Sequence, residues 1–166
     1  MRYGFGAIVA FSIALLQASS IDQFRLAGVA PNLMLVLLVC WLVVRGLEDV
    51  LPMIFVAGVT TALIGLQTPG LVLLALLPMA GLGVVRELHI VHSEALLAIG
   101  LVFVSSLAYE TVLLLSISAT GGVLDLTTAS THVVLPAAGV NVLITPFVFA
   151  VMRFAKAAPT RHRLAY

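Results

Sequence analysis

Apolar blocks alternate with short polar or turn-forming segments along the whole chain. Each block is close to the ~20 apolar residues that a helix needs to cross a bilayer. The pattern predicts six transmembrane helices at about residues 4–21, 29–44, 50–66, 70–85, 95–118 and 132–152. We therefore expect an all-α fold, a polytopic membrane protein with one transmembrane domain over residues 1–166.

Turn residues mark several of the predicted boundaries. Pro31 stands near the start of the second block, and Arg45-Gly46 provides a basic residue and a glycine at its end, as is common for helices. Pro69-Gly70 separates the third and fourth blocks and predicts an antiparallel hairpin. Both blocks are short and the fourth contains Pro78, so a re-entrant pair that does not cross fully remains an alternative.

The composition excludes a water-soluble fold. Hydrophobic residues make up 62% of the chain and charged residues 9%, whereas soluble domains have about 25% charged residues. Six spans use up 166 residues, so no soluble catalytic domain fits beside them. The single cysteine, Cys40, lies inside an apolar block, which excludes a disulfide framework and indicates a buried thiol.

Basic residues are distributed unevenly between the predicted loops. Short cytoplasmic loops of membrane proteins are enriched in Lys and Arg. If the N-terminus is cytoplasmic, only Arg25 lies on the opposite side, and the cytoplasmic segments contain Arg2, Arg45, Arg86, Arg153, Lys156, Arg161 and Arg163. We therefore predict that both termini are cytoplasmic, that Arg2, Arg45, Arg86, Arg153 and Lys156 act as cytoplasmic anchors, and that the number of crossings is even. An uncleaved first helix is a simpler account of the N-terminal segment than a cleaved signal peptide ending near Ala18.

Three polar residues are predicted at similar depth inside the apolar blocks: Gln17, Glu110 and Asn141. A charged residue at the centre of a membrane helix costs ~2.5 to 3.5 kcal/mol on insertion scales, so Glu110 should face the interior. We expect it to form a hydrogen bond with Asn141 or Gln17, with Tyr109 and Ser106 nearby. Two interpretations stay open: polar contacts that hold helices together, or a ligand or proton site.

Small residues recur every four positions in the first block, at Gly6, Ala10, Ala14 and Ala18. On a helix they form one face that allows another backbone to approach closely. This face either packs inside the chain's own bundle or docks a partner membrane protein.

No signature of an enzyme is present in the sequence. A nucleophile elbow, a Walker loop, paired CxxC motifs and a His-Glu-x-x-His helix are all missing. His89 and His92 lie beside Glu87 and Glu94, but this spacing lacks the arrangement typical of zinc ligands. We expect no catalytic residue, no metal and no cofactor. The basic C-terminal tail is explained by anionic lipid headgroups, without nucleic acid.

One segment carries a family resemblance. Residues 30–46 contain Pro31-Asn32, a leucine-rich run and a closing Arg45-Gly46, and they resemble the signature region of the rod shape-determining protein family MreD. The likeness continues through Gly58, the Pro69-Gly70 turn and the basic stop at Arg86. The length, the number of predicted spans and the topology also fit that family.

The resemblance implies a non-enzymatic component of the cell-wall elongation machinery in the bacterial inner membrane. Its partners would be MreC and, through it, the actin-like MreB and the RodA and penicillin-binding synthase pair. MreD proteins commonly have an aspartate in the third span, where this chain has Thr60, Thr61 and Ala62. A role that depends on that acid is therefore not transferred to this chain.

The MreD fold is similar to that of the substrate-binding S components of energy-coupling-factor transporters. S components often dock through an Ala-x-x-x-Ala stripe in their first helix, which Ala10 with Ala14, or Ala14 with Ala18, would match. The alternative function is therefore a small-molecule-binding transport subunit. The scaffold is favoured because aromatics total only 7% and few polar groups are available to line a ligand pocket.

Overall fold

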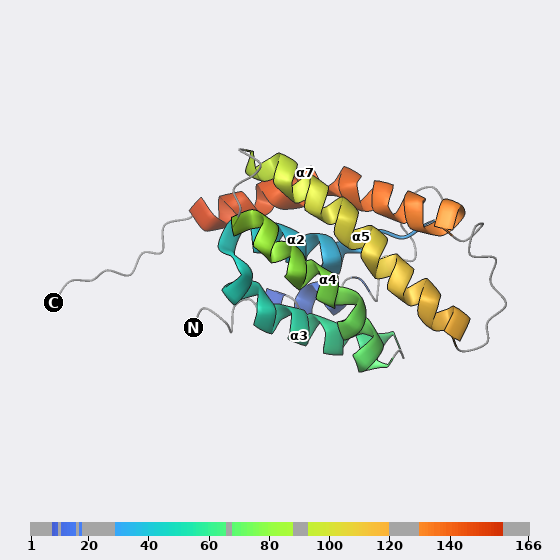
Figure 1. Cartoon of the computed structure of the whole chain (residues 1–166). Helices are drawn as coiled ribbons and strands as arrows, with labels where there is room; N and C mark the ends of the chain where they lie inside the picture. The colour runs from blue at the N-terminus through green and yellow to red at the C-terminus, as the bar shows by residue number, and fades with distance from the viewer. Residues whose placement is uncertain are drawn as a thin grey trace.

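The computed structural model describes residues 8, 9, 11–15, 17, 29–65, 68–87, 93–119 and 130–157, without the side chains of 85, 87 and 155–157. The described part is all-helical, with six helices counting the helical residues between 8 and 17 (Figure 1). The later elements are α2 (Leu33–Arg45), α3 (Leu47–Ile64), α4 (Pro69–Glu87), α5 (Glu94–Ala119), the π-helical turn η2 (Ser130–Val134) and α7 (Leu135–Ala157). The predicted all-α fold is confirmed.

Three helices are long and apolar enough to cross a membrane. They span Leu47–Ile64, Glu94–Ala119 and Ser130–Phe154. The apolar helices Leu33–Arg45 and Pro69–Val84 are shorter. The 13 residues of α2 rise about 20 Å, less than the ~30 Å thickness of the hydrocarbon core. The predicted number of crossings therefore stays a prediction.

Helix α2 lies at the centre of the bundle. Every side chain from Met34 to Val44 is buried, because this helix is apolar on all sides and has no face suited to water. It contacts α3, α4, α5 and α7, which surround it in Figure 1. The segment with the family resemblance is thus the core of the fold.

The α3–α4 pair forms the predicted antiparallel hairpin and packs closely at Gly58. A Cβ atom added at Gly58 would lie 2.6 Å from Cδ2 of Leu73, so a larger residue there would require the Leu73 side chain to move. Helix α4 packs in turn against α5, and α5 against α7. Helices α3, α4, α5 and α7 therefore contact one another in sequence around α2.

The outer surface of the described helices is apolar. Soluble monomers rarely expose large contiguous apolar patches, whereas a lipid-facing surface requires them. Large exposed hydrophobic side chains occur on the first helix and on α3, α4, α5 and α7, among them Phe11, Phe55, Leu77, Phe103, Leu143, Phe147 and Phe154. This surface is the one expected of a membrane protein.

One end of the bundle carries all the arginines that the structure describes. Helices α2, α4 and α7 end there and α5 begins there (Figure 1). Arg45, Arg86 and Arg153 belong to the last turns of these three helices or lie close to them. We call this the basic end. It matches the uneven distribution of basic residues in the sequence.

Candidate functional site

The start of α2 is buried, which creates a need for hydrogen-bond acceptors. The first N–H groups of a helix have no partner inside the helix, and burial removes water as a substitute. Asn32 is the N-cap residue, and its Oδ1 accepts a hydrogen bond from the Leu35 N–H at 3.1 Å. The Pro31-Asn32 pair therefore defines where α2 begins.

Gln17 and Asn141 supply further acceptors at the same place. Oε1 of Gln17 accepts from the Met34 N–H at 2.9 Å, and Nε2 of Gln17 lies 3.4 Å from Oδ1 of Asn32. Oδ1 of Asn141 accepts from the Asn32 N–H at 2.7 Å. Two of the three predicted polar residues thus meet at the start of α2, joined by Asn32.

Helix α5 completes this group. Nδ2 of Asn141 donates to Oγ of Ser106 at 3.0 Å, and both residues are buried. The Tyr109 hydroxyl interacts with the Asn32 side chain. We call Gln17, Asn32, Ser106, Tyr109 and Asn141 the α2 cap cluster. It joins the first helix, α2, α5 and α7 by polar contacts.

Glu110 does not join the α2 cap cluster, which corrects the predicted hydrogen bond to Asn141 or Gln17. Within the described part of the chain, its carboxyl group forms no hydrogen bond and is half-buried. Glu110 follows Ser106 by four residues, about 6 Å along α5. The amide of Asn141 is already bonded to Asn32 and Ser106.

The small-residue face of the first helix is described only at Ala14. This residue is 4% exposed and belongs to the core, while Phe11 and Leu15 of the same helix are exposed. At Ala14 the face therefore packs inside the chain's own bundle. Gly6, Ala10 and Ala18 lie outside the described residues.

The predicted cytoplasmic anchors differ in what they contact. The guanidinium of Arg45 lies 5.2 Å from the centre of the Trp41 ring. Nε of Arg86 donates to the Val43 carbonyl at 2.8 Å, which satisfies an acceptor at the end of α2. Arg153 is exposed near the end of α7. Arg2 and the side chain of Lys156 lie outside the described residues.

The chemistry of the α2 cap cluster is that of a structural contact. Its amides and hydroxyls bond to one another or to the backbone, and the cluster contains no nucleophile paired with a base. In the described ranges, no group of three or more His, Cys, Asp or Glu residues is placed to hold a metal ion. Sequence reasoning missed the role of Asn32, although an asparagine directly before an apolar run is a typical N-cap signal.

The fold and the cluster together define a class: an all-helical protein with an apolar outer surface, three helices able to cross a membrane, and a buried central helix held by amides. Comparison of the chain with protein-family models, curated proteins and solved structures finds no match.

Proposed function

We propose that this chain is a non-enzymatic scaffold of the bacterial cell-wall elongation complex, similar to MreD. In this proposal it lies in the inner membrane, crosses it six times with both termini in the cytoplasm, and binds MreC. The observation that supports the proposal most is the position of the resembling segment: its Pro31-Asn32 and Arg45-Gly46 pairs form the two ends of the central helix α2.

The polar residues favour a scaffold over a transport subunit. An S-type protein needs polar groups free to contact a small molecule. Here the amides of Gln17, Asn32 and Asn141 are already bonded to one another or to the start of α2. A scaffold requires no free polar groups inside the bundle, since its partners contact the outer surface.

The partner can be tested by purification from native membranes. A C-terminally tagged chain, extracted in mild detergent, should retain MreC and synthase subunits, and mass spectrometry identifies them. An equally tagged six-span protein from the same membrane serves as the control. Retrieval of ATP-binding-cassette subunits with a bound small molecule would instead support the transport subunit and refute the scaffold.

The topology can be tested by cysteine labelling in a Cys40→Ser background. A single cysteine is placed in turn at Thr68, in the 88–92 connection or in the 121–129 connection, and a membrane-impermeant maleimide is added to intact cells. Six crossings predict labelling at Thr68 and at 121–129 but not at 88–92. Protection of Thr68 together with labelling at 121–129 would indicate a re-entrant hairpin and four crossings.

A further inference from the structure

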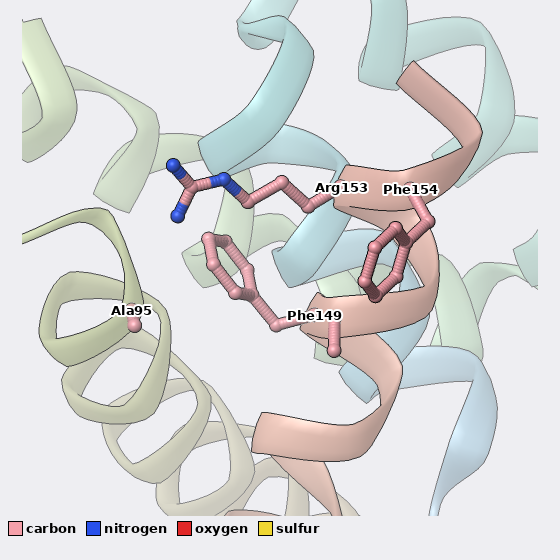
Figure 2. Close-up of a pocket in the computed structure, with 5 residues that line it drawn as sticks. Ala95, Phe149, Arg153 and Phe154 are labelled. Carbon is pink, nitrogen blue, oxygen red and sulfur yellow. The ribbon is translucent and has the colours of Figure 1, made fainter. Parts of the chain in front are cut away.

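A cavity of about 470 Å³ opens between the first turn of α5 and the last turns of α7. It lies at the basic end, away from the α2 cap cluster. Its lining residues are Ala95 of α5 and Phe149, Ala150, Arg153 and Phe154 of α7 (Figure 2). The described part of the wall is therefore apolar apart from the Arg153 cation.

Arg153 differs from the other described arginines in its contacts. Arg45 lies over the Trp41 ring, and Arg86 donates to the Val43 carbonyl. Within the described residues, Arg153 forms no ion pair and no hydrogen bond. Figure 2 shows the Arg153 side chain extending from α7 in the same direction as the Phe149 ring, toward the helix that carries Ala95. Its guanidinium is available to an anion.

The position of the cavity along the membrane normal suits a lipid. The apolar stretch of the last helix runs from Ser130 to Phe154, so Arg153 stands where that stretch ends. In a bilayer, this is the level at which the hydrocarbon gives way to the phosphate groups. Phe149 is 5% exposed and forms part of the core, whereas Phe154 is exposed and faces outward. An acyl chain can thus follow apolar surface below the cation.

We propose that this cavity binds an anionic phospholipid, with its phosphate on Arg153 and one acyl chain along the apolar wall between Phe149 and Ala95. The argument is charge complementarity: the described lining residues include a guanidinium and no carboxylate that would attract the ammonium group of a zwitterionic headgroup. The proposal rests on the membrane location proposed above, but not on the scaffold role.

The test measures lipid binding to the purified full-length chain in nonionic detergent by native mass spectrometry. Phosphatidylglycerol and phosphatidylcholine with identical acyl chains are titrated separately. The wild-type chain should bind phosphatidylglycerol more tightly. Arg153→Gln should weaken that binding about fivefold, the effect of one basic residue near an anionic headgroup, and leave phosphatidylcholine unchanged. Arg45→Gln removes the same charge at the same end outside the cavity and should retain the preference.

A second variant tests the apolar wall. Ala150 is exposed and lines the cavity, so Ala150→Trp fills it without overpacking the core. This variant should lose the first bound molecule of either lipid. If circular dichroism shows that Arg153→Gln does not fold, Ala150→Trp alone tests the proposal. Glycerol 3-phosphate, a headgroup without acyl chains, should not compete.

Four results would overturn the lipid site. Arg153→Gln or Ala150→Trp could bind phosphatidylglycerol as tightly as the wild-type chain, or Arg45→Gln could lose as much affinity as Arg153→Gln. Competition by glycerol 3-phosphate would instead indicate a site for free phosphate. The scaffold role is measured separately by retention of MreC. A chain that binds phosphatidylglycerol but retains no MreC refutes the scaffold alone, and the reverse result refutes the lipid site alone.

Discussion

Gly46 joins α2 to α3 in a backbone conformation that other residues rarely adopt. Its φ is 103° and its ψ is 172°, a region occupied almost only by glycine. We expect Gly46→Ala to destabilise the fold, because a side chain in this conformation clashes with its own backbone. Strain of this kind costs about 1 to 3 kcal/mol.

The surroundings of Gly46 add to this loss. A Cβ atom there would lie 3.0 Å from Nη1 of Arg86, so the guanidinium has to move. Nε of the same guanidinium donates to the Val43 carbonyl at 2.8 Å, and moving it weakens that bond. The two effects share Arg86. In an Arg86→Met background, Gly46→Ala should therefore cost less than it does in the wild-type chain.

The free energy of unfolding can be measured for the purified chain in mixed micelles by titration with sodium dodecyl sulfate, followed by circular dichroism. Gly100→Ala is the matched control, since Gly100 lies inside α5 with no atom within 4 Å of an added Cβ. That change should be neutral or stabilise by up to about 1 kcal/mol. The reasoning fails if Gly46→Ala unfolds like the wild-type chain, or if Gly100→Ala loses as much.

The remaining predictions use the same titration. Asn141→Leu should destabilise by about 1 to 3 kcal/mol, because the half-buried Asn32 N–H loses its acceptor, whereas Thr145→Val removes only a donor to a helix carbonyl and should have little effect. Ser106→Ala should cost about 0.6 to 2 kcal/mol, since Nδ2 of Asn141 loses its partner. Ser105→Ala should be neutral, because its buried Oγ has no partner among the described residues. Equal losses in the two variants would contradict the role of the Ser106 hydrogen bond. Arg86→Met should cost about 1.5 to 3 kcal/mol, because the Val43 carbonyl near the end of α2 loses its donor, and Arg45→Met, whose side chain is exposed, should cost less.

The helices were predictable because hydropathy and turn residues determine them locally. Arg45-Gly46 and Pro69-Gly70 stand where α2 ends and where α4 begins. The burial of α2 was not predicted. A helix that is apolar on all sides suits lipid and protein interior equally well, so hydropathy cannot distinguish a central helix from a lipid-facing one.

The polar contacts were predicted only in part, for a geometric reason. Gln17 and Asn141 were grouped by their depth along separate helices, and both do reach the start of α2. Depth alone placed Glu110 with them, but the depth of a residue does not specify which way its side chain points from the helix, and Glu110 forms no hydrogen bond among the described residues. Asn32 stands at the start of its apolar block, and its Oδ1 accepts from the Leu35 N–H, an N-cap contact that depth along a helix does not indicate.

The length of α2 explains why polar residues lie inside so apolar a bundle. At 13 residues the helix is shorter than the hydrocarbon core, so in a membrane at least one of its ends lies where no water can satisfy the backbone. Asn32, Gln17 and Asn141 take that role at its start. At its end, Arg86 of α4 binds the Val43 carbonyl beside Gly46. Because separate helices secure the two ends of α2, substitutions at Asn141 and at Arg86 should weaken α2 at opposite ends. Their losses in the free energy of unfolding should therefore add.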